Sequence, residues 1–399
     1  MNISTPLRRI AHHHTRTTAL LHPHSWSFST SPTRNETNKD PPSPLQNISD
    51  AEIQSAQSYC LTLLRHHDSP SYLLQTFIPS SSRQAYIALR ALNIDIARIA
   101  DTTSAPAVAS LRYQFWRDSI SSSLSGKPPK EPVAILLAAA AANLRTRNPS
   151  GGGWSKLWLH RMINEREKRF GGRPFVDLKD LEGYAENTYS TLLYLTLAAL
   201  PMHSVIADHV ASHIGKAAGI VASLRGLPLL AFPRPANHHS LNRDGLGGVA
   251  GVGGSQRQGI VNLPLDVMAS ACVREEDVLR QGPSASGLRD AVFEVATRAN
   301  DHLITAREMI KNLRAGRNVG HEFEHSGEQG YDLTPEETAR EGEWSDVERA
   351  WGVYMQAVPT QLWLDRLEKS DFDVFNEALR RSDWRLPWNA YWAFRRKNI

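Results

Sequence analysis

One stretch decides the fold: Tyr86–Asp101, which reads YIALRALNIDIARIAD. It has the length of a helix, contains neither glycine nor proline, and is apolar around most of its circumference. A surface helix would carry a single apolar stripe, so this pattern predicts a helix that is buried nearly all round. Helical spacing gathers its polar strip on Arg90, Asn93, Ala97 and Asp101, with Arg98 at the edge. Such a strip faces either a cavity or polar partners on neighbouring helices.

The composition is that of a chain that can bury a substantial core. Its 399 residues, 41% of them apolar, give room for one large domain or two smaller ones. The net charge of +4 is modest and lies largely near the N-terminus, so we expect no nucleic-acid binding. Cys60 and Cys272 stand far apart, which predicts neither a disulfide framework nor a metal-binding set. No apolar run has the ~18 residues of a membrane-spanning helix, so we expect any membrane contact to be peripheral.

Residues 1–45 have the composition of a mitochondrial transit peptide and disordered leader. Arginines are scattered among many Ser, Thr and His residues, and no acidic residue precedes Glu36. This pattern predicts import into mitochondria and later removal of the leader. The folded domain is expected to span residues 46–399, with flexible insertions at about 231–259 and 314–342, which are rich in glycine and polar residues.

Helical periodicity recurs along the domain, and strand-like alternation is not evident, so the predicted fold class is all-α. A capping box, Ser49 with Glu52, marks the start of the first helix. In the helix expected over Val108–Leu124, we predict that Leu111, Phe115 and Ile120 point inward. The other expected helices are Arg83–Asp101, Pro132–Leu144, Trp154–Phe170, Leu178–Leu200, Val205–Leu224, Glu275–Arg280, Ser286–Leu313, Trp344–Val358 and Leu362–Arg380.

The C-terminal stretch Trp384–Ile399 combines aromatic and basic residues. Trp384, Trp388, Tyr391 and Trp392 recur at near-helical spacing beside a basic cluster, Arg395–Lys397. Aromatic rings next to cations suit the boundary between lipid headgroups and water. The alternative is that these rings dock the last helix onto the core, and the sequence leaves both interpretations open.

Several runs, in this order, resemble the squalene/phytoene synthase superfamily, and more closely its mitochondrial complex I assembly factor branch. They are Tyr59–Leu61, Ala88–Ala91 with Asn93, Gln114–Trp116, Asn164–Lys168, Tyr184–Thr188, Leu192–Leu197 and Ala211–Ala217, with weaker support from Gln258–Pro264 and the C-terminal tail. The resemblance covers about residues 59–399, broken by the two insertions. It implies an isoprenoid synthase-like helical bundle around a central cavity. It also implies a role in complex I assembly, at the matrix side of the mitochondrial inner membrane.

The enzymes of that superfamily join prenyl diphosphates with Mg²⁺, which carboxylates on two facing helices hold. The resemblance places the first motif, Asp-Asp-x-x-Asp, on residues 97–101, where only Asp101 is acidic and a cation, Arg98, follows Ala97. It places the second set of Gln, Asn and Asp positions on Gly219, Ala222, Gly226 and Leu230. One isolated carboxylate does not make a Mg²⁺ cluster. We therefore expect no catalytic residues, no bound metal and no enzymatic activity.

Basic residues remain as candidates for binding an anion or a lipid inside the bundle. They are Arg83, Arg90, Arg98, Lys216, Arg225 and Arg257. The alternative is that they pair, purely structurally, with Glu165, Glu167, Glu182, Glu186 and Asp101. His209 and His213 have a spacing that metal ligands use on helices, but no third ligand is evident nearby, so we predict no zinc site.

Three functions follow from these patterns. The first is a non-catalytic assembly factor for complex I, whose partners would be complex I subunits or other assembly factors. The second is a Mg²⁺-dependent prenyltransferase of the squalene/phytoene synthase type. The third is a protein that binds a lipid or prenyl phosphate without converting it. The altered motif positions favour the first.

Overall fold

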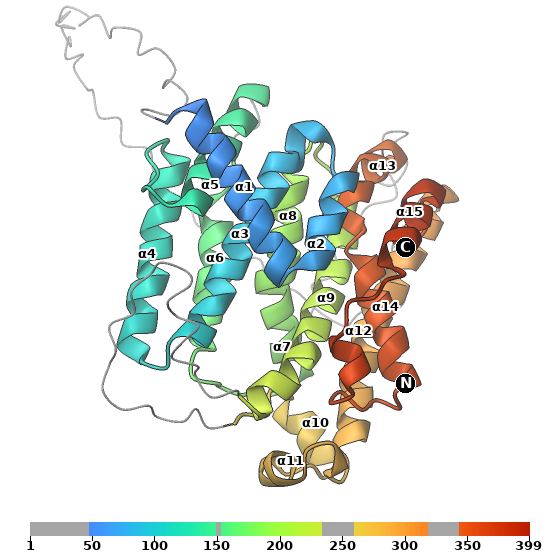
Figure 1. Ribbon diagram of the computed structural model, residues 1–399. Coiled ribbons are helices and arrows are strands. Elements are labelled where there is room, and N and C mark those ends of the chain that lie inside the picture. The colour runs from blue at the N-terminus through green and yellow to red at the C-terminus, as the bar shows by residue number, and fades with distance from the viewer. Residues whose placement is uncertain (1–47, 149–152, 234–258, 318–342) are drawn as a thin grey trace, which may run out of the picture. The chain divides into compact units, whose positions relative to one another are not determined.

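The computed structural model describes residues 48–148, 153–233, 259–317 and 343–399, and throughout these ranges the regular structure is helical, without strands (Figure 1). The all-α prediction is confirmed. The leader, Arg257 and most of both expected insertions lie outside the described residues. The main helices are α1 (Asp50–His67), α2 (Ser69–Leu74), α3 (Ser80–Thr102), α4 (Pro106–Leu124), α5 (Pro132–Arg147), α6 (Lys156–Lys168), α7 (Leu178–Ala185), α8 (Thr191–Leu197), α9 (Val205–Ala231), α10 (Leu265–Ser270), α11 (Glu275–Gln281), α12 (Leu288–Arg314), α13 (Glu343–Tyr354), α14 (Ala357–Lys369) and α15 (Leu386–Arg396). Short turns are η1 (Gln75–Phe77), η2 (Glu186–Ser190), η3 (Gly282–Ser284) and η4 (Glu377–Arg380).

The first helix begins where the sequence predicts. The backbone N–H of Ser49 donates to the Glu52 carboxylate over 2.8 Å, and the backbone N–H of Glu52 donates to the Ser49 hydroxyl over 3.3 Å. These reciprocal bonds satisfy two donors that the first turn of a helix otherwise leaves without partners. The capping box therefore fixes the start of the described domain.

Helix α3 contains the stretch Tyr86–Asp101. Every residue from Ala85 to Ile94 is buried, and α1, α4, α5, α6 and α8 all pack against this helix (Figure 1). Its last turn is different, because Ala97, Ala100 and Asp101 are exposed. The prediction of a helix buried on nearly all sides is thus confirmed for the first three-quarters of its length.

The long helix expected over residues 178–200 contains a π-helical turn. Helices α7 and α8 are joined by η2, in which the hydrogen-bond pattern widens and one extra residue is accommodated. Helix α9 lies against this turn. A Cβ atom on Gly215 would come within 2.4 Å of the Ser190 Cα, and one on Gly219 within 2.5 Å of the Ala185 Cβ. Glycine is therefore required at both positions for the two backbones to approach so closely.

Helix α9 forms the second centre of the fold. It packs against α7, α8, α12, α13 and α14 (Figure 1). Helix α8 contacts both α3 and α9 and so connects the two central helices. By length and composition alone α9 is apolar enough to cross a membrane, but 67% of that apolar window is buried inside the protein. This burial identifies α9 as a core helix of the bundle.

One detail of the α4 prediction is wrong. Ile120 is buried as expected, but Leu111 is 71% exposed and Phe115 is exposed as well. The buried face of α4 instead consists of Ala109, Tyr113, Trp116 and Ile120. That face follows the same helical period one or two positions away, and it buries two larger aromatic rings, so packing selected it over the stripe of Leu111 and Phe115.

We expect Gly215→Ala to lower the free energy of unfolding by roughly 1–3 kcal/mol, because the new methyl group overlaps the Ser190 backbone. Gly226→Ala, on the same helix, is the matched control, since its Cβ would meet no atom within 4 Å. Alanine favours helix over glycine, so this control should raise stability by up to about 1 kcal/mol. Urea unfolding followed by circular dichroism measures both, and equal values for the two variants would contradict the close approach.

Candidate functional site

The polar strip of α3 divides into a buried part and an exposed part. Arg90 is 2% exposed and Asn93 is 7% exposed, whereas Ala97 and Asp101 lie at the exposed end. The predicted strip therefore enters the core only through its first two members. Of the three positions that the resemblance assigns to metal-holding carboxylates on this helix, Ala97 and Asp101 are exposed and Arg98 is half-buried.

Arg90 is a buried cation whose neighbours are mostly uncharged. Its guanidinium carbon lies 5.3 Å from the centre of the Tyr86 ring, and its Nε has no hydrogen-bond partner in the described part of the chain. The Tyr86 hydroxyl donates to the Ser71 carbonyl over 3.3 Å. Burial raises the pKa of Tyr86, and the charge of Arg90 opposes that rise. This cation is thus stabilised by an aromatic ring.

Asn93 has a partner that the sequence did not single out. Arg166, on α6, donates to the Asn93 carbonyl oxygen and to the Tyr184 hydroxyl, the latter over 3.4 Å. Arg166 is 7% exposed, and burial raises the pKa of the neighbouring Tyr113 to about 12. Helices α3, α6 and α7 therefore meet at a guanidinium bound to neutral oxygens.

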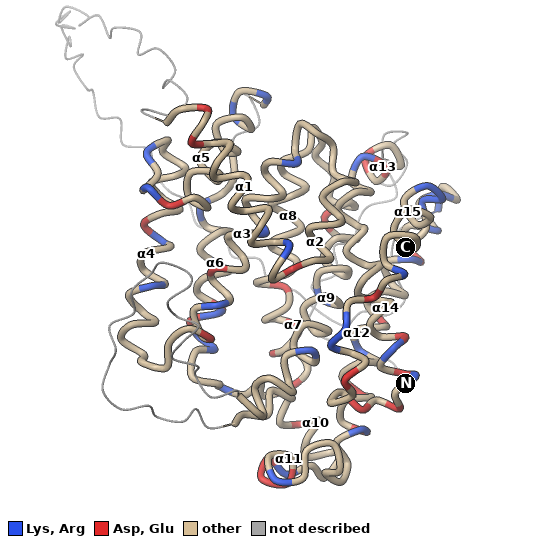
Figure 2. The backbone as a smooth tube through the Cα atoms, viewed as in Figure 1, with Lys and Arg blue, Asp and Glu red and all other residues tan. Residues whose placement is uncertain are grey.

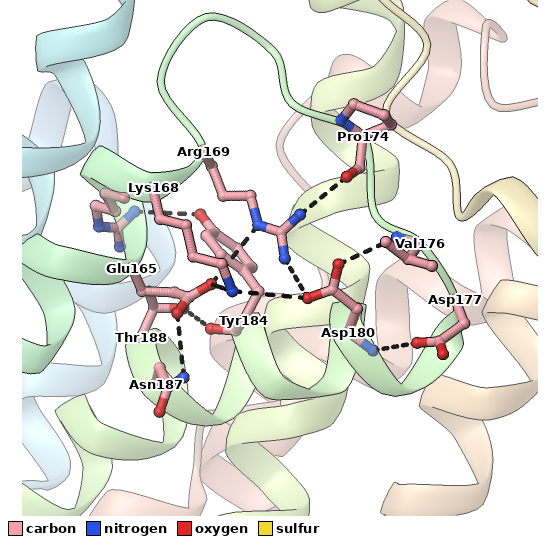
Figure 3. A network of polar contacts seen from close by, with 11 residues as sticks. Glu165, Lys168, Arg169, Pro174, Val176, Asp177, Asp180, Tyr184, Asn187 and Thr188 are labelled. Atoms are coloured by element: carbon pink, nitrogen blue, oxygen red, sulfur yellow. Dashed lines mark hydrogen bonds and ion pairs between the residues drawn. The ribbon is translucent and has the colours of Figure 1, made fainter.

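Beside this point, α6 and α7 are joined by a network of ion pairs (Figure 3). Glu165 lies 3.6 Å from Arg169 and 3.8 Å from Lys168, and it accepts a hydrogen bond from Asn187 Nδ2 over 3.2 Å. Arg169 also binds Asp180 and donates to the Pro174 carbonyl. The carboxylates here are thus already neutralised by neighbouring cations.

Asp180 shows the electrostatic consequence of that network. Burial alone would raise its pKa, but the hydrogen bonds from Arg169 and from the backbone N–H of Val176 outweigh burial and lower it. The N-cap of α7, Asp177, accepts from the backbone N–H of Asp180 over 2.7 Å. These bonds hold the loop before α7 against the end of α6.

The π turn places Glu186 against α8 and α9. Its carboxylate accepts from the Tyr194 hydroxyl over 2.7 Å and from the Ser212 hydroxyl over 2.9 Å. Burial and the charge of Glu186 raise the pKa of Tyr194, so this tyrosine stays protonated. Glu186 thus acts as an internal acceptor of hydrogen bonds.

A buried polar chain links α9, α12 and α7. Glu182 binds Arg298, and the His302 Nε2–H donates to the Glu182 carboxylate over 2.8 Å. The Nδ1 atoms of His302 and His213 are 3.0 Å apart, so one ring donates a hydrogen bond to the other, in a direction set by their tautomers. Burial opposes ionisation of Glu182, but the bonds from His302 and Arg298 outweigh it and lower its pKa to about 2.

His302 is the neighbour that the sequence did not reveal for the His209–His213 pair. The rings of His209 and His213 are 5.2 Å apart. Even so, no group of three or more His, Cys, Asp or Glu side chains arranged to hold a metal occurs in the described ranges. A residue 89 positions away cannot be found from helical spacing, because only the packing of α12 on α9 brings it near.

The described candidate basic residues lie on two helices, α3 and α9, and differ in burial. Arg83 donates to the carbonyls of Gln75 and Ile78, over 3.1 Å each, and so holds the η1 turn. Arg98 is half-buried near Asp95, whose pKa rises to about 7 through burial and the charge of Glu131, with Arg98 opposing that rise.

On α9, Lys216 is half-buried and Arg225 is exposed. Of the described candidates, only Arg90 is deeply buried. The expected pairing of these cations with acidic residues is also different in detail. Glu165, Glu167 and Glu182 are bound by other cations, namely Lys168, Arg169, Arg117 and Arg298.

The positions implied by the resemblance do not suit a Mg²⁺ cluster. Gly219 is packed so closely on Ala185 that no side chain fits there. Ala222 and Gly226 are half-buried and Leu230 is exposed, and none of the three has a side-chain oxygen that could bind a metal. With Asp101 at the exposed end of α3, the two helices do not bring carboxylates together. Magnesium needs several oxygen ligands in octahedral geometry, so this donor set does not fit it.

Two surface pockets are present elsewhere. One, of about 630 Å³, lies on α10 and α12 and includes Cys272, Phe293 and Arg298. The other, of about 290 Å³, lies where α12, α14 and α15 meet and includes Arg307, Trp392 and Arg396. None of the described basic candidates lines either pocket.

The sequence matches the family model described as squalene/phytoene synthase over residues 64–233 and 250–392. This chain belongs to the squalene/phytoene synthase family. Among curated members, it is 33% identical over 333 residues to "NADH dehydrogenase (ubiquinone) complex I, assembly factor 6" of Bos taurus, covering 84% of this chain and 80% of that protein. It is 27% identical over 340 residues to the homologue from Drosophila melanogaster, covering 84% and 82%.

Solved structures of squalene/phytoene synthase family enzymes share the fold. A dehydrosqualene synthase in complex with ligand gives a TM-score of 0.59 at 15% identity, covering 87% of this chain and 98% of that one. A squalene synthase from Alicyclobacillus acidocaldarius gives 0.54 at 11% identity, covering 82% and 97%. The helical bundle implied by the sequence is therefore confirmed as the fold of this family member.

We expect Glu182→Gln to lower the free energy of unfolding by roughly 2 kcal/mol or more, because it leaves Arg298 and His302 without their buried anion. Glu167→Gln, at a partly exposed ion pair with Arg117, should cost about 1 kcal/mol or less. Chemical denaturation at neutral pH measures both changes.

The same variant gives a pH test. Glu182 has a lowered folded pKa of about 2 against 4.5 ordinarily, so its stabilising effect is complete above pH 4.5 and disappears as the pH falls toward 2. The stability difference between wild type and Glu182→Gln should therefore shrink across that window. A difference that stays constant with pH would show that His302 and Arg298 do not lower the pKa of Glu182.

Proposed function

We propose that this chain is a non-catalytic factor in the assembly of mitochondrial respiratory complex I. The observation that carries this is the retained fold with most of both carboxylate sets lost: Ala97 and Arg98 stand on α3, where only the exposed Asp101 remains acidic, and Gly219, Gly226 and Leu230 stand on α9. The relatives whose names include complex I assembly factor 6 support the same conclusion, since they match more than four-fifths of the chain. The work of the protein would then be binding, with complex I subunits or other assembly factors as partners.

We further infer that the protein works at the matrix face of the mitochondrial inner membrane, as a peripheral protein. The support is the leader-like composition of residues 1–45 and the burial of α9, the one helix of the described ranges that is long and apolar enough to span a bilayer. A helix enclosed by its own bundle is not available to lipid. Contact with the membrane would therefore be made by the surface of the folded domain.

Binding of a lipid or prenyl phosphate without turnover is a second candidate function. Arg90 favours it, because a guanidinium at 2% exposure whose Nε lacks a hydrogen-bond partner in the described residues is a ready site for an anionic oxygen. Arg166, at 7% exposure and also without a partner for Nε among those residues, would add a second cation. In this second function, the site at Arg90 and Arg166 would bind its ligand without converting it.

Asp101→Asn tests the non-catalytic proposal in cells. In a strain that lacks this gene and has lost assembled complex I, we expect the variant to restore complex I to the wild-type level, because the remaining motif carboxylate does no chemistry. Native gel electrophoresis with in-gel NADH dehydrogenase staining measures the outcome. A variant protein that accumulates normally and leaves complex I unassembled would overturn the proposal, as would a deletion strain with normal complex I.

The purified chain provides the matching biochemical test. With farnesyl diphosphate and Mg²⁺, we expect no release of diphosphate above the level without protein. Release that depends on Mg²⁺ and on Asp101 would establish the prenyltransferase alternative instead.

Native mass spectrometry tests the second candidate function. If an anionic ligand is bound at Arg90, the wild-type chain should carry a phosphate-containing lipid and Arg90→Gln should lose most of it. Arg289→Gln, at an exposed ion pair with Asp371, is the control and should retain the ligand. A wild-type chain that carries no lipid would exclude this function.

A further inference from the structure

The C-terminal helix, α15, has one face on the protein and one face without a covering. Leu386 and Ala390 are buried, and the Phe394 ring lies 5.0 Å from the Phe77 ring. Beyond the helix, Arg307 donates to the Ile399 carbonyl over 2.7 Å, and Arg314 donates to the Lys397 carbonyl. The expected docking of the last helix onto the core is thus confirmed, and α15 also presents a second, exposed face.

That second face is strongly aromatic. On α15, Trp388 is 66% exposed and Tyr391 and Trp392 are each about half exposed, and Trp384, just before the helix, is 78% exposed. Within the described ranges, the exposed tryptophans are Trp384, Trp388 and Trp392, and all belong to the last sixteen residues of the chain. The other tryptophans of the described ranges are buried or half-buried, as with Trp351 at 0% exposure. Contiguous exposed aromatic area of this kind marks an interaction surface.

The charge beside these rings is positive. Arg395 and Arg396 are exposed on the last turn, and the Arg396 guanidinium lies 5.1 Å from the centre of the Trp392 ring. Figure 2 shows the blue of lysine and arginine gathered around α15, and residues 386–399 contain no acidic residue. Arg396 and Trp392 also line the 290 Å³ pocket beside α15. An anionic group is therefore the complementary ligand for this end of the helix.

We propose that the exposed face of α15 is the membrane-contacting surface of this protein, which binds bilayers that contain anionic phospholipid. Tryptophan and tyrosine rings prefer the level of the lipid headgroups, and adjacent arginines bind the headgroup phosphates. With 11 residues, α15 is too short to span a bilayer and suits a position in the plane of the interface. The inference rests on the proposed peripheral location and identifies the surface that would produce it.

A protein partner is the competing occupant. The order of the side chains favours lipid, because the aromatic rings form a strip along the helix and the cations follow at its end without acidic residues between them. A lipid surface requires no further shape complementarity from such a strip. The test therefore makes the protein partner one of its outcomes.

Vesicle sedimentation with the purified full chain tests the proposal. We compare phosphatidylcholine vesicles with vesicles of phosphatidylcholine and phosphatidylglycerol. Wild type should bind the anionic vesicles more tightly, and added salt should weaken that binding. Arg395→Gln with Arg396→Gln should lower the affinity by about 25-fold, at roughly fivefold for each charge. Trp388→Ser with Trp392→Ser should lower it by about tenfold or more on both vesicle types.

Matched variants elsewhere on the surface are the controls. Arg274→Gln with Arg280→Gln removes two exposed charges at α11, and Leu111→Ser with Leu157→Ser removes two exposed apolar side chains at α4 and α6. These pairs should leave vesicle binding unchanged, and circular dichroism should show that every variant is folded. Equal losses in the control pairs would overturn the assignment to α15.

The outcomes separate this inference from the proposed function. Wild type that binds neither vesicle overturns the inference and leaves a protein partner for this face. If wild type binds anionic vesicles through α15, but a strain that lacks the gene still has normal complex I, the assembly role is overturned and the inference stands. Variants of α15 that lose vesicle binding, but not the full chain's ability to restore complex I, show that membrane contact and assembly are separate properties.

Discussion

The structure depends on the close approach of α9 to the α7–η2–α8 segment. Two glycines, Gly215 and Gly219, permit it, because any side chain there would overlap Ser190 or Ala185. The π turn supplies the matching surface by widening one turn of the opposing helix. Beside this contact, Glu182 binds His302 and Arg298 on α12, and Glu186 binds Tyr194 on α8 and Ser212 on α9. Backbone packing and buried polar bonds thus occur together in this part of the fold.

The acidic residues near this contact are compensated by cations of the fold itself. A bundle that binds Mg²⁺ must keep several carboxylates without internal cations, and that arrangement is costly unless a metal is bound. Here Glu165, Asp180 and Glu182 each have an arginine or lysine within the fold. Bonds from His302 and Arg298 lower the pKa of Glu182 to about 2, which reflects this internal compensation. Carboxylates compensated in this way need no bound metal to be stable inside the fold.

Local signals in the sequence were sufficient for most elements and insufficient for the polar centre. The Ser49–Glu52 capping box, the buried α3 and the all-α class follow from periodicity and caps, which act over a few residues. The partners of Asn93 and His213 do not, because Arg166 and His302 are 73 and 89 positions away. The inward assignment of Leu111 failed for a related reason: two stripes of α4 were compatible with one period, and tertiary packing chose between them.

The tail shows how docking and exposure are reconciled on a single helix. Docking α15 on the core would by itself favour burying its largest rings, since these carry the most apolar area. Instead, Leu386, Ala390 and the ring of Phe394 face the protein, and the larger rings of Trp388 and Trp392 face outward. A helix held by its less apolar contacts, with tryptophans left in water, is unfavourable for an isolated monomer. The arrangement is explained when the outward face has an environment of its own, and the neighbouring arginines indicate that this environment carries negative charge.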